Sequence, residues 1–141
     1  MGISCMRKTF GIIILSIYIA VLCVFAAAEY FYQAGKADGD VEKIKIAAFL
    51  NPFVSDYRYE IFDQSNPKDI ASIKEAIRLE PLKASYHMFY GLELLRDYSK
   101  RTRASDQIAF HEIARAYALK PYSAQYKQIY EHDAKPYIVN P

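Results

Sequence analysis

An uncharged stretch of 19 residues near the amino terminus constrains this chain more than any other feature. Phe10–Ala28 reads FGIIILSIYIAVLCVFAAA, in which only Gly11 and Ser16 are not hydrophobic. As an α-helix that rises about 1.5 Å per residue, a segment of this length spans the hydrocarbon core of a bilayer. We therefore predict a transmembrane helix over residues 10–28, through which the chain contacts the membrane.

The charges on either side of this segment indicate its orientation. The chain has 18 Lys and Arg residues against 16 Asp and Glu, and only Arg7 and Lys8 among the basic ones precede residue 29. Positive residues favour the cytoplasmic side of a membrane helix. The sequence therefore predicts a single-pass protein with a cytoplasmic flank over residues 1–9 and a periplasmic, or otherwise extracytoplasmic, remainder.

A cleaved signal peptide stays open as the alternative. Ala26-Ala27-Ala28 resembles a signal-peptidase site, and cleavage after Ala28 would release a soluble periplasmic protein. The apolar core before this site, Phe10–Phe25, is slightly longer than the 7 to 15 or so residues that are typical of signal peptides. Its length favours the anchor.

The part of the chain after residue 28 is formally neutral, with 16 basic and 16 acidic residues. Proteins that bind nucleic acid concentrate basic residues on one face, so we expect no nucleic-acid partner. The two cysteines, Cys5 and Cys23, form neither a disulfide framework nor a CxxC metal or redox pair. The remainder is long enough for one small hydrophobic core.

Three segments of this remainder align without gaps. They read IKIAAFLNPFVSDY from Ile44, IKEAIRLEPLKASY from Ile73 and IARAYALKPYSAQY from Ile113, and all follow I-x-x-A-x-x-L-x-P-φ-x-x-x-Y, where φ is a large apolar residue. Ile, Ala and Leu at this spacing share one stripe of a helix, and the small Ala permits close approach of a neighbouring helix. The proline ends that helix and suits the first turn of the next one. Each segment therefore predicts the second helix of one hairpin and the first helix of the next.

These signals predict helices over residues 8–36, 40–50, 52–63, 67–79, 82–98, 105–119 and 122–132, with Asn51 and Asn66 as N-caps and no helical pattern in the tail, residues 136–141. The spacing of the second copy, counted back from Ile44, places the start of the first repeat at Ala28. The first repeat helix therefore overlaps the end of the apolar segment. Cleavage after Ala28 would leave only a short stub of that helix, which again favours the anchor.

The pattern resembles the tetratricopeptide repeat (TPR), in which a small residue precedes a proline by five positions. The resemblance covers about residues 25–135 and implies an all-α fold, in which an N-terminal transmembrane helix is followed by a superhelix of TPR-like α-hairpins over residues 29–135. The implied repeat-structural residues are Ala47, Pro52, Tyr57, Ala76, Pro81, Tyr86, Gly91, Ala116, Pro121 and Tyr126. Leu79–Gly91 is also similar to repeats at the carboxyl ends of O-antigen polymerases and ligases, which implies a place in the cell envelope.

The number of tyrosines indicates a contact surface. The chain has 13 of them, more than hairpin packing requires, and exposed aromatic rings on a neutral scaffold are typical of protein-binding faces. Stacked hairpins form a concave groove that is lined by first-helix residues. We expect this groove to bind a protein partner through Tyr59, Tyr90, Glu93, Tyr98 and Tyr130.

Residues with the pattern of a catalytic or metal site are missing from the sequence. His111-Glu112 begins like the zinc motif HExxH, but Arg115 replaces the second histidine. We therefore expect no enzyme activity, no metal, no cofactor and no small-molecule substrate. The expected function is that of a membrane-anchored scaffold or assembly subunit in a cell-envelope complex. The alternative is a cleaved, secreted periplasmic protein that binds peptides.

Overall fold

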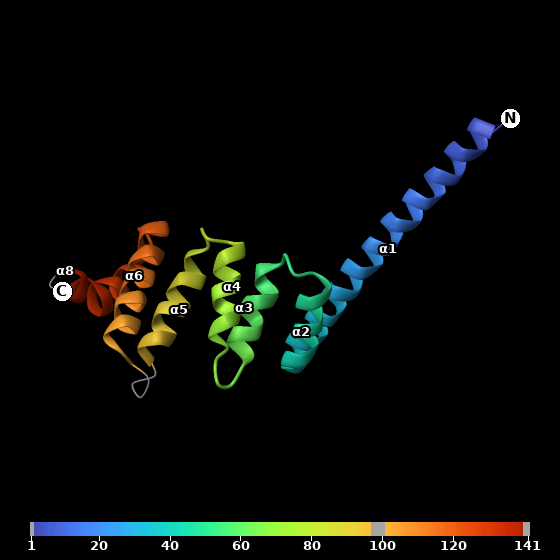
Figure 1. Cartoon of the computed structure of the whole chain (residues 1–141). Coiled ribbons are helices and arrows are strands. Elements are labelled where there is room, and N and C mark those ends of the chain that lie inside the picture. Colours follow the sequence, from blue (N-terminus) through green and yellow to red (C-terminus); the bar gives the residue numbers. More distant parts are fainter. Residues whose placement is uncertain (1, 97–100, 140–141) are drawn as a thin grey trace.

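The computed structural model describes residues 2–96 and 101–139, and this part of the chain is helical without strands. The helices are α1 (Gly2–Asp38), α2 (Val41–Leu50), α3 (Ser55–Gln64), α4 (Ile70–Leu79), α5 (Ala84–Arg96), α6 (Arg103–Leu119), α7 (Ala124–Ile129), the π-helical turn η2 (Tyr130–Ala134) and α8 (Lys135–Val139). They form consecutive hairpins in a row, from which the N-terminal part of α1 projects alone (Figure 1). The predicted all-α class is confirmed.

Helix α1 combines two different environments along a single axis. No residue from Phe10 to Ala26 is buried, and the large apolar side chains of this stretch are exposed on every side of the helix. The part of α1 from Phe10 to Asp38 is long and apolar enough to cross a membrane or to form part of a signal sequence. The turns of α1 from Ala28 onward, by contrast, pack on α2 and α3 (Figure 1).

The point at which the environment of α1 changes is Ala28. Its side chain is 0% exposed and belongs to the first hydrophobic cluster. The buried members of that cluster are Ala28, Ile44, Ala47, Ala48, Tyr57 and Ile61. The predicted overlap between the apolar segment and the first repeat is therefore confirmed at the residue that the repeat spacing indicated.

Two further clusters continue the core along the row. The second joins α3, α4 and α5 through Phe62, Ile73, Ala76, Tyr86 and Tyr90. The third joins α5, α6 and η2 through Met88, Phe110, Ile113, Ala116 and Ala134. Each cluster thus combines the two helices of one hairpin with the helix that follows it. The core is a chain of neighbouring contacts, as in quasi-one-dimensional repeat proteins.

The α1–α2 connection is short because two adjacent residues have complementary roles. Gly39 adopts a positive φ of 68°, a conformation that glycine adopts without strain. The amide of Asp40 then donates a hydrogen bond to the carbonyl oxygen of Gly35 at 2.8 Å, which closes the end of α1. The Asp40 carboxylate accepts from the amide of Glu42 and so caps α2.

The prolines occupy turns, not the first turns of the following helices as expected. Pro52, Pro81 and Pro121 each precede the first helical residue by three positions. In the second turn the amide of Lys83 donates to the carbonyl oxygen of Glu80 at 3.2 Å, and the third turn has the matching bond. The proline therefore lies at the second position of a β-turn, where its fixed φ is favoured.

The expected asparagine caps are also wrong. The Asn51 side chain accepts from the amide of Phe53 within its own turn, and α3 begins after Val54, which makes no side-chain cap. Helix α4 is capped by Asp69, which follows the expected cap Asn66 by three residues. The tail also differs from the prediction, because α8 includes residues 135–139.

Glycine at position 91 allows α5 to approach α6 closely. A Cβ atom on Gly91 would lie 2.8 Å from Cγ1 of Ile113 and 2.9 Å from the carbonyl oxygen of Ala109. We expect Gly91→Ala to lower the unfolding free energy by about 1–3 kcal/mol, because the backbone oxygen cannot move aside without separating the helices. Chemical denaturation of the full chain in detergent, followed by circular dichroism, measures this loss.

Gly11→Ala is the matched control, because nothing lies within 4 Å of the added methyl group. An equal midpoint of unfolding for the two variants would show that close packing at Gly91 does not stabilise the array.

Candidate functional site

The repeat motif places the same two side chains in the core of every copy. Its isoleucine and alanine are fully buried in all three, at Ile44 and Ala47, Ile73 and Ala76, and Ile113 and Ala116. Ile44 and Ile113 contact the first helix of their own hairpin where that helix lacks a side chain, at Gly35 and Gly91. These positions hold the hairpins together, as the helical spacing indicated.

The motif tyrosine links each hairpin to the one before it. The hydroxyl of Tyr57 donates to Oε2 of Glu29 at 2.9 Å, and its ring packs against Tyr32. The hydroxyl of Tyr86 donates in the same way to Oδ1 of Asp56 at 2.6 Å. In both copies a tyrosine near the start of one helix binds a carboxylate on the first helix of the preceding hairpin.

These contacts change the ionisation of the groups that make them. Burial raises the pKa of Tyr57 to about 12, and the hydrogen bond to Glu29 acts in the same direction. Hydrogen bonds from Lys83 and Tyr86 lower the pKa of Asp56 below its usual range. Lys83 Nζ lies 2.6 Å from Oδ1 of Asp56, so the second junction carries an ion pair as well.

Among the described residues, the third copy shows no such junction. Tyr126 is half-buried in the third cluster, and burial raises its pKa. The residue of α5 that corresponds to Asp56, directly before the motif tyrosine, is Ser85, which offers no carboxylate. The link between tyrosine and carboxylate therefore joins the hairpins nearest to α1.

The expected contact tyrosines pack mostly within the array. Tyr90 is 6% exposed and belongs to the second cluster, so it stabilises the fold and offers almost no surface to a partner. Tyr59 is half-buried and stacks on Tyr86 at 5.2 Å between ring centres. Tyr130 is half-buried in the third cluster and stacks on Tyr117. Tyr98 lies outside the described residues.

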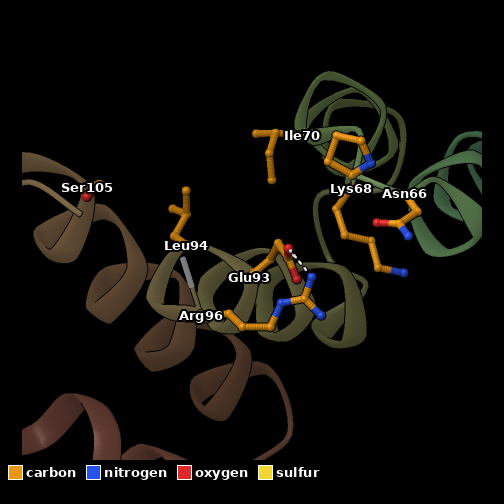
Figure 2. Close-up of a pocket in the computed structure, with 8 residues that line it drawn as sticks. Asn66, Lys68, Ile70, Glu93, Leu94, Arg96 and Ser105 are labelled. Carbon is orange, nitrogen blue, oxygen red and sulfur yellow. Dashed lines mark ion pairs between the residues drawn. The ribbon is translucent and has the colours of Figure 1, made fainter. Parts of the chain in front are cut away.

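Glu93 is the expected contact residue that lines a pocket. This pocket has a volume of about 400 Å³ and lies where α4 begins and α5 ends, with one wall from α6. Its lining residues are Asn66, Pro67, Lys68, Ile70, Glu93, Leu94, Arg96 and Ser105, and Figure 2 shows them around the opening. Apart from Glu93, these residues were missed, because they come from three elements and share no sequence spacing.

The pocket has both charges and an apolar part. Glu93 and Arg96 form an ion pair at 3.0 Å, in which the glutamate side chain is largely covered and the arginine is exposed (Figure 2). Lys68 pairs with Asp63 at 3.6 Å, so its charge is partly balanced. Ile70 and Leu94 supply the apolar surface and also pack on the second cluster. A mixed lining of this kind suits the side chains of a polypeptide segment.

A buried histidine also escaped the sequence analysis. His87 is fully buried, with Nδ1 at 2.5 Å from Oε2 of Glu112 and Nε2 at 2.9 Å from the carbonyl oxygen of Pro81. Each ring nitrogen therefore has a hydrogen-bond partner. His87 thereby ties α5 to α6 and to the turn before α5. No sequence signal connects residues this far apart.

The described ranges contain no group of three or more His, Cys, Asp or Glu side chains that could hold a metal ion. His111, which begins the incomplete zinc motif, is exposed on α6, while Glu112 is engaged by His87. In comparisons with known proteins, the chain matches no protein family and no curated sequence.

The Tyr57 hydroxyl gives a prediction about stability and pH. Because burial and Glu29 raise its folded pKa from 10 to about 12, the contact stabilises the fold fully below pH 10, and this stabilisation is lost as the pH rises through 12. We expect Tyr57→Phe to lower the unfolding free energy by about 1 kcal/mol at pH 7. Denaturation of wild type and variant between pH 7 and 12 should show the difference narrowing above pH 10.

Tyr122→Phe is the control, because that tyrosine is fully exposed. A loss in Tyr57→Phe that stays constant up to the highest pH, or that Tyr122→Phe matches, would contradict this account of the junction.

Proposed function

We propose that this protein is a membrane-anchored, TPR-like scaffold that holds a protein partner at a cell-envelope membrane. The observation that carries the proposal is the continuity of α1, which is exposed and apolar from Phe10 to Phe25 and part of the core from Ala28 onward. Such a helix joins an anchor to a binding array without a flexible linker. The array then stands at a fixed place relative to the bilayer.

Contacts along α1 support this rigid junction. Ala28 is fully buried against α2 and α3, and Tyr57 binds Glu29 one residue later. Two turns further along, Lys36 pairs with Glu60 of α3 at 3.3 Å. The second oxygen of Glu60 accepts from Gln64, so this largely buried carboxylate has partners on both oxygens. Anchoring of this kind raises the effective concentration of the array near a membrane partner without additional contacts.

The repeat pattern supports a TPR-like array. Five identical positions recur in each copy, and two of them, the isoleucine and the small alanine, are buried every time. Every cluster needs the helix of the next repeat, which is the dependence on neighbours that stacked α-hairpins have. The basic flank at Arg7 and Lys8 supports a cytoplasmic N-terminus and an extracytoplasmic array.

The pocket around Glu93 is the proposed place for the partner. Its opposite charges and its apolar floor suit a polypeptide segment, and the formal neutrality of the chain after residue 28 supports a protein and not a nucleic acid. A secreted peptide-binding protein, released by cleavage after Ala28, is the second candidate. The site Ala26-Ala27-Ala28 favours it, but cleavage there would remove a fully buried residue from the first cluster.

Charge reversal in the pocket tests the proposal. We expect Glu93→Lys to reduce recovery of the partner severalfold when the tagged full chain is purified from membranes in detergent and bound proteins are identified by mass spectrometry. Glu75→Lys is the matched control, because Glu75 forms the same i,i+3 ion pair with Arg78, on α4 and outside the pocket. Both variants lose a helix-surface pair worth only about 0.2–0.5 kcal/mol, so a difference between them reports on the pocket.

The same sample separates the anchor from the secreted alternative, because intact mass shows whether residues 1–28 are present. Recovery of the full chain in the membrane fraction is the expected result. An intact mass that corresponds to a chain beginning at Glu29 would contradict the anchor. Equal partner recovery by both variants would contradict the assignment of the pocket.

A further inference from the structure

Each turn between repeats carries a large apolar side chain that the fold leaves exposed. Phe53, Leu82 and Tyr122 directly follow the motif proline in the three copies, and they are 79%, 76% and 101% exposed. The motif thus retains a large apolar residue at a position that contributes nothing to the core. Exposed apolar side chains in a regular series indicate a contact with something outside the chain.

The pairing of α1 with α2 sets the height of the first of these turns. Gly35 of α1 faces Ile44 of α2, and the two helices run antiparallel. Ala28 lies seven residues before Gly35 and Asn51 lies seven residues after Ile44, so Ala28 and Asn51 lie opposite each other. The turn that contains Phe53 therefore lies beside the end of the apolar segment. Phe49, in the last turn of α2, is 83% exposed at the same height.

The second turn is held at the height of the first. Lys83, which directly follows Leu82, binds Asp56 at the start of α3, and Tyr86 binds the same carboxylate. The start of α3 is in turn fixed to Glu29 of α1 through Tyr57. In Figure 1 all three turns between repeats lie along one edge of the row, the edge toward which the N-terminal part of α1 rises, and the loops within the hairpins lie along the other.

We propose that this edge, formed by Phe53, Leu82 and Tyr122, dips into the headgroup region of the bilayer that α1 crosses. The inference rests on the proposed anchoring by α1. A lipid surface fits these residues because aromatic and apolar side chains favour the boundary between headgroups and acyl chains. Membrane helices commonly tilt by about 20° from the bilayer normal, and a tilt in this direction moves the edge toward the membrane.

The contact is apolar and not electrostatic. Lys83 beside Leu82 is already bound to Asp56 and lies 3.3 Å from Glu80. The array consequently lies along the membrane, with the pocket near Asn66 and Lys68 on the edge that faces the water. The contact should persist at high salt, because apolar burial is not screened as surface charges are.

The absence of tryptophan from the sequence makes a direct test simple. Three variants, Phe53→Trp, Leu82→Trp and Tyr122→Trp, each carry one tryptophan, which lies at one of the turns. The full chain is reconstituted in liposomes of phosphatidylcholine with brominated acyl chains, which quench the fluorescence of a tryptophan that contacts them. Ala37→Trp and Asn66→Trp are the controls, because both residues are exposed on the opposite edge. We expect severalfold stronger quenching and bluer emission at the turns than at the controls, unchanged by 1 M salt.

Quenching at the turns that equals quenching at the controls would overturn the inference. Emission that shifts with protein concentration but is not quenched by the lipid would also overturn it, because a second copy of the chain would then cover the edge. A further variant, Tyr18→Trp in the apolar segment, tests the proposed anchor separately from the proposed membrane contact of the edge. Strong quenching at Tyr18→Trp alone would leave the anchor intact, whereas none at this position would refute the anchor itself.

Discussion

The burial of Ala28 against α2 and α3 is the contact on which the rest of the structure depends. It lies at the boundary between an apolar helix that contacts nothing in the described chain and the first hydrophobic cluster. A larger side chain there would separate α1 from α2, because Ala47 and Ala48 belong to the same cluster. The small residue lets one helix serve both as proposed anchor and as first repeat helix. The next residue, Glu29, then binds Tyr57 and fixes the position of α3.

The rest of the array propagates from this junction through similar contacts. Close approach within a hairpin occurs where a glycine faces a motif isoleucine, at Gly35 and at Gly91. Contact between hairpins occurs where a motif tyrosine reaches a carboxylate on the preceding first helix, as Tyr86 reaches Asp56. Because each cluster needs the next repeat, the stability of the array is shared among neighbours. Within the third hairpin, the buried pair of His87 and Glu112 also ties α5 to α6.

Sequence reasoning found the parts of this fold that depend on periodicity. The motif isoleucines and alanines were identified because one helical stripe faces one neighbour, and the repeat spacing alone indicated Ala28. Sequence reasoning did not show which side chains of the first helices are buried, because each of these helices faces two clusters at once. Tyr57 and Ile61 of α3 pack on the first cluster, whereas Phe62 and Tyr59 pack on the second. A surplus of aromatic residues therefore did not imply an exposed groove.

The pocket and the turns could not be predicted from the sequence for a different reason. The residues around Glu93 meet only because three elements end near one another, and no spacing in the sequence records that meeting. The prolines were correctly predicted to end helices, but two further turn residues separate each proline from the next helix. Those extra residues carry the exposed side chains that form the proposed membrane edge.

The central claim is that α1 continues without a break from the membrane into the array. Hydrogen–deuterium exchange of the full chain in lipid nanodiscs measures this directly, because amides in a continuous and packed helix exchange slowly. The account predicts that amides from Glu29 to Gly35 are protected as strongly as those of the buried stretch of α2 around Ala47. Fast exchange from Glu29 to Gly35, with protected segments on either side, would reveal a hinge and contradict the account.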